Sequence, residues 1–198
     1  MTVDPSWHLA VALVALLGVA VAWSVLGRLQ LGRSMVWAAV RAVLQLAVVS
    51  LIIVVALTHV LAALAFAALM FVVAVWTTAG RVEARRSIGW VALAMLVGVV
   101  PVMAVIFASG VMPFTGVAIV PIFGIIIGNA MNGHTLICRR AFATLREEHG
   151  LYEAGLAIGL VRSEAIGEMI GRRTRESLLP NLDTTRTVGL VTLPGAFV

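Results

Sequence analysis

Three side chains that could bind a soft metal ion lie close together in one apolar segment. Met131, His134 and Cys138 follow one another at spacings of three and four residues, which in a helix places them on one face. Thioether, imidazole and thiolate groups are ligands of soft and borderline transition metals. Packing is the alternative, because methionine is also an ordinary filler of helix interfaces. No firm metal site follows from one helix alone, so both interpretations stay open.

Polar residues inside apolar segments form a second group of candidates. An ionisable or amide group at bilayer depth is costly unless it is paired or hydrated. Arg41 and Gln45 lie one helical turn apart, and Arg41 either extends to the lipid headgroups or contacts a partner helix or the transport pathway. Asn129 follows Gly128, where a small neighbour allows close helix approach and the amide can link two helices. Contact with a substrate is the alternative for Asn129.

The common catalytic motifs are missing from the sequence. All 14 basic residues are arginine, so the lysine that a P-loop places on nucleotide phosphates is absent. No Ser–His, paired-aspartate or H-E-x-x-H constellation occurs either. We therefore expect a chain that is not itself catalytic and binds no cofactor. The arginines cluster beside apolar segments without interleaved aromatic residues, which argues against nucleic acid as a partner.

The composition indicates a membrane protein. Hydrophobic residues make up 62% of the chain and the mean hydropathy is +1.09, above the usual range of soluble domains. Crossing the hydrocarbon core takes about 20 mostly apolar helical residues, and five segments satisfy this: His8–Gly27, Val36–Leu57, Val60–Ala79, Ile88–Ala108 and Phe114–Cys138. A sixth begins near Thr187 and is too short to cross. The sequence predicts an all-α polytopic protein with five transmembrane helices, the start of a sixth, and lipid around it.

The arginines predict the orientation of these spans. They follow the first, third and fifth spans, at Arg28, Arg33, Arg81, Arg85, Arg86, Arg139 and Arg140, and the intervening loops carry none. Because cytoplasmic loops are enriched in basic residues, the N-terminus is expected outside and the segment 139–186 in the cytoplasm. That segment holds 8 of the 14 arginines and 7 of the 9 acidic residues. Its charge makes it the part that can contact soluble proteins.

The segment 139–186 is expected to form two helices. The first continues from the fifth span through Leu156, and the second starts near Ser163 as its N-cap and is ended by Pro180. Ile166 lies on the apolar face of this second helix, with most of the charges elsewhere. An amphipathic helix of this kind suits the membrane interface or a groove on a partner. A solvated connector between spans is the alternative.

Small residues mark the part of this segment that we expect to contact another protein. Glu153-Ala154-Gly155 is followed by Gly159, and small residues allow a tight turn and close backbone approach. The motif looks like the E-A-A-x-x-x-G loop of ABC importer permeases, which inserts a short coupling helix into the ATPase subunit. The Leu-Pro pair of that pattern stands later in this chain, at positions 179 and 180.

Three longer stretches resemble the FetB-type permeases of bacterial iron-export ABC transporters. They are Arg41-Ala-Val-Leu-Gln45-Leu, Val120-Pro-Ile-Phe-Gly-Ile-Ile-Ile-Gly128-Asn129-Ala-Met131 and Thr187-Val-Gly189-Leu-Val-Thr-Leu-Pro194-Gly195. The resemblance implies one permease domain over 1–198 in the bacterial cytoplasmic membrane, working as a homodimer and exporting iron or another metal. A separate ATPase subunit would bind ATP and Mg. Coupling to it would rest on Glu153, Ala154, Gly155, Gly159, Ser163 and Ile166.

The same resemblance implies a longer protein. Members of the family continue through the sixth span and one more, so the end at Val198 predicts a C-terminally incomplete domain, either a fragment or a truncated gene product. Two other functions stay open. A channel or secondary transporter without an ATPase would favour inverted repeats and acidic or histidine pairs at the midplane, and no Asp or Glu lies inside a predicted span. A truncated, non-transporting membrane scaffold is the other alternative.

Overall fold

The computed structural model describes residues 7–186, without the side chains at 52, 54–56 and 172. All secondary structure in this range is helical. The chain separates into two units, Met1–Val55 and Ala56–Phe197. The predicted sixth segment from Thr187, with Gly189, Pro194 and Gly195, lies outside the described residues.

The first unit is a pair of helices, α1 (Trp7–Leu26) and most of α2 (Gly32–Thr58). A short turn joins them, and the backbone N–H of Leu31 donates a hydrogen bond to Oγ of the buried Ser24 at 3.2 Å. Gly32 allows close approach there, because a Cβ at this position would lie 3.3 Å from Cγ1 of Val21. Most apolar side chains of the two helices are exposed, which suits helices surrounded by hydrocarbon.

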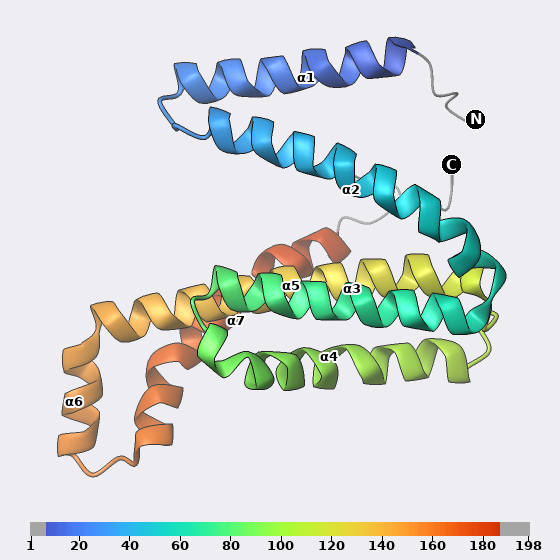
Figure 1. Ribbon diagram of the computed structural model, residues 1–198. Coiled ribbons are helices and arrows are strands. Elements are labelled where there is room, and N and C mark those ends of the chain that lie inside the picture. The colour runs from blue at the N-terminus through green and yellow to red at the C-terminus, as the bar shows by residue number, and fades with distance from the viewer. Residues whose placement is uncertain (1–6, 187–198) are drawn as a thin grey trace. The chain divides into compact units, whose positions relative to one another are not determined.

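The second unit is built on three helices that lie side by side, α3 (Val60–Arg81), α4 (Ile88–Ala108) and α5 (Gly116–Glu147) (Figure 1). The short 3-10 helix η1 (Arg85–Ser87) leads from α3 into α4. Small and flexible side chains fill the space between them: Ala74, Val75, Ala79, Val91, Met95, Val99, Met103 and Ile127. Lipid tails are as apolar as these side chains, so membrane helices associate through close packing, which small residues allow.

Five helical segments of the described chain are long and apolar enough to cross a membrane, which confirms the predicted fold class. The bounds of α4 match the predicted span Ile88–Ala108. Helix α5 is longer than the predicted span Phe114–Cys138. Its 32 residues extend for about 48 Å, well beyond a hydrocarbon core of about 30 Å. Its last turns therefore stand clear of the apolar layer.

Beyond α5 the chain forms a helical hairpin of α6 (His149–Ala157) and α7 (Arg162–Arg186). Helix α7 returns along α5 in the opposite direction (Figure 1). The prediction of one helix running unbroken from the fifth span through Leu156 is wrong, because α5 ends at Glu147. Glu148 between the two helices has φ −109° and ψ 33°, and this non-helical residue redirects the chain into α6.

The prediction that Pro180 ends the second helix is also wrong, since α7 continues through it to Arg186. A proline inside a helix removes one backbone hydrogen bond and costs about 3 kcal/mol. Before the proline, Ser177 is buried, and after it Nδ2 of Asn181 lies 3.5 Å from the place of a Cβ on Gly133 of α5. Helix α7 thus stays close to α5 past its proline, although its side chains from Leu178 onward are exposed.

Candidate coupling site at the α6–α7 hairpin

A glycine turn closes the hairpin between α6 and α7. Gly159 has φ +94°, a backbone conformation that favours glycine. Its N–H donates to the carbonyl of Leu156 at 3.1 Å, and the N–H of Leu160 donates to the carbonyl of Gly155 at 3.1 Å. These two bonds form the Schellman motif that ends many helices. The structure therefore places the tight turn at Gly159.

Gly155 allows the two arms of the hairpin to pack closely. A Cβ at this position would lie 3.3 Å from Cβ of Ala165 and 3.5 Å from Cδ1 of Leu160. Ala165, on the opposing helix, is buried. The close backbone approach at Gly155 is thus made within the chain, between α6 and α7. Contact of Gly155 with another protein stays a prediction.

The start of α7 is fixed by a carboxylate and not by a serine cap. An oxygen of Glu164 accepts a hydrogen bond from the N–H of Val161 at 3.2 Å, the return half of a capping box with Val161 at the N-cap. The prediction of Ser163 as N-cap is wrong, because α7 begins at Arg162 and Ser163 lies in its first turn. Ile166 is partly buried next to the buried Ala165, so part of the predicted apolar face packs inside the chain.

An ion pair holds the base of the hairpin. Nη2 of Arg173, on α7, lies 2.8 Å from Oε1 of Glu148 at the junction of α5 and α6. Nδ1 of His149 lies 3.5 Å from Oε1 of Glu153 along α6. Exposed pairs contribute little stability, about 1 kcal/mol or less each. Their effect is geometric, since Arg173 ties α7 to the point where the chain leaves α5.

The hairpin is joined to the arginine-rich end of the three-helix unit. Nε of Arg139, on α5, donates to the backbone carbonyl of Arg81 at 3.0 Å, at the end of α3, where a cation is favoured by the helix dipole. Two turns further along α5, Nη2 of Arg146 lies 3.4 Å from Oε2 of Glu83. A force on the hairpin can therefore reach α3 as well as α5.

The tip of the hairpin presents apolar side chains to the surroundings. Ile158 is 80% exposed and Val161 is 57% exposed, on either side of the Gly159 turn. Glu153 and Ala154, on α6, are exposed as well. A projecting helix pair with an apolar tip and a charged flank has the form of a segment that docks into a groove of another protein. The arrangement suits binding and the transmission of movement.

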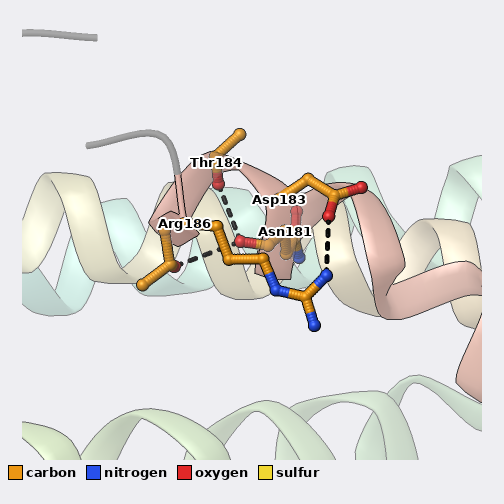
Figure 2. A network of polar contacts seen from close by, with 5 residues as sticks. Asn181, Asp183, Thr184 and Arg186 are labelled. Carbon is orange, nitrogen blue, oxygen red and sulfur yellow. Dashed lines mark hydrogen bonds and ion pairs between the residues drawn. The ribbon is translucent and has the colours of Figure 1, made fainter. Parts of the chain in front are cut away.

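A local polar network lies in the last described turns of α7. Figure 2 shows the hydroxyl of Thr184 directed toward the carbonyl of Asn181, to which it donates at 2.7 Å. The hydroxyl of Thr185 donates to the same carbonyl at 3.2 Å. Nη1 of Arg186 lies 3.3 Å from Oδ1 of Asp183. All of these contacts join residues three or four positions apart within α7.

Comparison with known proteins decides the family. The family model described as "Uncharacterised protein family (UPF0014)" matches residues 6–198. The chain belongs to this family. The UPF0014 membrane protein STAR2 of Oryza sativa subsp. japonica is 35% identical over 190 residues, which are 94% of this chain and 66% of that relative. The "Probable iron export permease protein FetB" of Escherichia coli (strain K12) is 30% identical over 191 residues, 94% and 73% of the two chains.

A third relative matches over a shorter stretch. The "Protein ALUMINUM SENSITIVE 3" of Arabidopsis thaliana is 34% identical over 104 residues, 52% of this chain and 38% of that relative. The chain thus spans about two thirds of the rice relative's length and less of this one. No solved structure matches. The membrane-length helices of this chain and its UPF0014 relatives together establish that it is a multi-pass membrane protein.

The described residues predicted to take part in helix packing or in the transport pathway lie outside the hairpin, on α2 and α5. In the first unit, Arg41 and Gln45 are exposed on α2. In the second, Asn129 is exposed midway along α5, and a Cβ on the neighbouring Gly128 would meet no atom within 4 Å. This open space leaves room for another helix. The predicted roles of these residues in helix packing or in the pathway stay predictions.

Two of the three soft-metal candidates contact each other, and the third packs against the helix core. Sγ of Cys138 lies 3.5 Å from Nε2 of His134, and both side chains are partly buried. Met131 packs against the core of α3, α4 and α5. Within the described residues, no three His, Cys, Asp or Glu side chains gather into a group that could hold a metal ion. The structure therefore brings together two of the three candidates.

Sequence reasoning misses the residues at the hairpin tip. Ile158 and Val161 are absent from the predicted coupling set, although they are the exposed apolar side chains beside the turn. Their signal in the sequence is a short apolar run around Gly159 inside a strongly charged segment. The ion pair between Arg173 and Glu148 is also missed, because the two residues lie 25 positions apart and only the fold brings them together.

Proposed function

We propose that this chain is the permease subunit of an ABC transporter and that the α6–α7 hairpin couples it to a separate ATPase subunit. The observation that carries the proposal is the hairpin itself. It leaves the arginine-rich end of α5, turns at Gly159, and presents Ile158 and Val161 at its tip. The family of the chain and the permease named among its relatives support this assignment.

The mechanism is mechanical. ATP and Mg bind to the partner ATPases, and closure of an ATPase dimer moves the docked hairpin. Because α7 packs along α5, and α5 is tied to α3 through Arg139 and Arg81, this movement reaches the membrane helices. In this proposal two copies of the permease form the pathway. From the arginine-rich loops and the positive-inside rule we infer that the hairpin lies in the cytoplasm and the N-terminus outside.

Iron, or another metal ion, is the proposed cargo, moved outward across a bacterial cytoplasmic membrane. The support is the name of the Escherichia coli relative, an iron export permease. Cells that express the intact permease and ATPase should hold less of the exported metal under metal load than cells lacking the pair. Equal intracellular iron, zinc, copper and manganese in both strains, measured by mass spectrometry, would exclude metal export.

The coupling assignment is tested at the exposed tip. Ile158→Glu places a charge where an apolar side chain, 80% exposed, would enter the ATPase groove. We expect co-purification with the co-expressed ABC ATPase from the same genome to fall at least about tenfold, because burying an unpaired charge costs several kcal/mol. The hairpin itself should fold normally, since Ile158 contributes little buried surface.

Val111→Glu is the matched control. Val111 is 76% exposed in the loop between α4 and α5, at the end of the three-helix unit opposite the hairpin. The same charge there should leave ATPase association unchanged. If both variants, or neither, lose the ATPase, the hairpin tip is not the docking site and the coupling role is refuted.

A further inference from the structure

His134 and Cys138 take no part in the coupling site, yet their side chains meet. Sγ of Cys138 and Nε2 of His134 are 3.5 Å apart on successive turns of α5. Both side chains are partly buried, and Cys138 is the last residue of the predicted fifth span, directly before the charged segment that begins at Arg139. An S–H···N hydrogen bond fits this separation, and so does a metal ion held between the two atoms.

The distance between the two atoms matches the geometry of a metal centre. A tetrahedral Zn²⁺ holds a thiolate at about 2.3 Å and an imidazole nitrogen at about 2.0 Å, which separates the two ligand atoms by about 3.5 Å. The observed separation is 3.5 Å. The two ligand atoms therefore already stand at the separation that a bound Zn²⁺ would require. Thiolate and imidazole are also the ligands that zinc-type ions favour over hard cations.

The surroundings favour exchangeable binding over a closed structural site. Structural zinc sites use four protein ligands, whereas an open coordination position allows exchange. Here α5 supplies two ligands, which leaves further coordination positions open. Arg139 follows Cys138, but its Nε donates to the carbonyl of Arg81 at 3.0 Å, which directs this guanidinium to the end of α3.

We propose that His134 and Cys138 form a binding site for a borderline divalent transition metal ion of the Zn²⁺ type, at the arginine-rich end of the α5 membrane segment. On binding, the Cys138 thiol releases its proton to solvent, and the thiolate and the neutral Nε2 each donate an electron pair to the metal. If the bound metal is the cargo, the site rests on the proposed transport function. Metal binding by His134 and Cys138 does not depend on that function.

Co²⁺ is the probe, because a cysteine thiolate bound to Co²⁺ gives a charge-transfer absorption band. Cys138 is the only cysteine of the chain, so this band reports one residue. Titration of the purified, detergent-solubilised chain should give a saturable band that Zn²⁺ displaces. Cys138→Ser should remove the band. His134→Ala and His134→Gln should each weaken Co²⁺ binding at least about tenfold, the loss typical of a perturbed metal site.

His149→Ala is the matched control. His149 lies on α6, with Nδ1 3.5 Å from Oε1 of Glu153, and its removal should leave the titration unchanged. A second measurement uses alkylation of the Cys138 thiol by a small maleimide, which Zn²⁺ should slow in the wild-type chain and not in His134→Gln. No band at saturating Co²⁺, or a band unchanged in both His134 variants, would reduce the pair to a hydrogen bond and overturn the site.

The metal-site proposal and the coupling proposal can be refuted independently of each other. Loss of the Co²⁺ band with intact ATPase association removes the metal site and leaves the coupling role standing. An intact, His134-dependent band in a chain that binds no ATPase keeps the metal site and removes its role in ATP-driven transport.

Discussion

At the scale of single residues, two glycines shape the α6–α7 hairpin for different physical reasons. Gly159 is required by its positive φ of 94°, which side-chain-bearing residues adopt at a cost of about 1–2 kcal/mol. Gly155 is required by space, because a Cβ there would lie 3.3 Å from Cβ of Ala165. The sequence motif contains both glycines, but only the folded hairpin separates the two requirements.

Replacing Gly155 by leucine should therefore open the hairpin. The added side chain meets Ala165 and Leu160, and overpacking of this kind costs about 1–3 kcal/mol. Limited proteolysis of the α6–α7 turn in detergent should become faster. Gly150→Leu is the control in the same helix, because a Cβ there meets nothing within 4 Å. It should slow proteolysis slightly, since leucine is favoured over glycine in helices by about 0.5–1 kcal/mol. Equal rates in both variants would contradict the packing role of Gly155.

At the scale of elements, helix positions could be predicted from the sequence more closely than helix ends. Apolar segments of membrane length locate α1 to α5 because hydrocarbon demands that composition. Two ends depended on tertiary contacts instead. Helix α5 stops at Glu147, where the Glu148–Arg173 pair holds the corner. Helix α7 passes Pro180, a residue that the sequence marks as a helix end, while it runs along α5. Local sequence carries neither contact.

The candidate site was predictable to a similar degree. The segment around Glu153 and Gly159 was found from its small residues, and the i,i+4 spacing of His134 and Cys138 placed them on one face. The apolar tip was not found, because exposure of Ile158 and Val161 depends on how α6 and α7 pair. Burial and exposure are properties of the folded hairpin, and a composition pattern reports them only indirectly.

Packing of α7 supports a prediction about how the hairpin is held. Met169 is 7% exposed, and among the described elements α7 packs against α5 and α6. Met169→Ala should leave a cavity between these helices and cost about 2–5 kcal/mol. Hydrogen–deuterium exchange should then rise along α7 while α3 and α4 stay protected. Leu179→Ala, a comparable truncation at a side chain 47% exposed, is the control and should change little. Equal effects of the two variants would mean that α7 is not anchored through Met169.

At the scale of the whole molecule, one face of α5 calls for a protein neighbour. Exposed residues follow a helical stripe along its membrane portion, at Ile125, Asn129, Asn132 and Leu136. Two of the four are amides, and an amide facing hydrocarbon without a hydrogen-bond partner costs several kcal/mol. The open space over Gly128 allows a second helix to come close. In the proposed homodimer, the matching face of a second copy would supply both the amide partners and the packing.

This arrangement predicts a cross-link at one position and not at another. In a two-fold dimer a residue near the axis lies next to its own copy, so Asn129→Cys in a Cys138→Ser background should form a disulfide-linked dimer in membranes on mild oxidation. Val97→Cys in the same background is the control, because Val97 is 66% exposed midway along α4, on a helix without exposed amides. Its cross-linked fraction should stay below about a tenth of that at Asn129. Dimers of equal yield at both positions would indicate random collision in the bilayer, and a monomer at Asn129 would assign the amide face to some other helix.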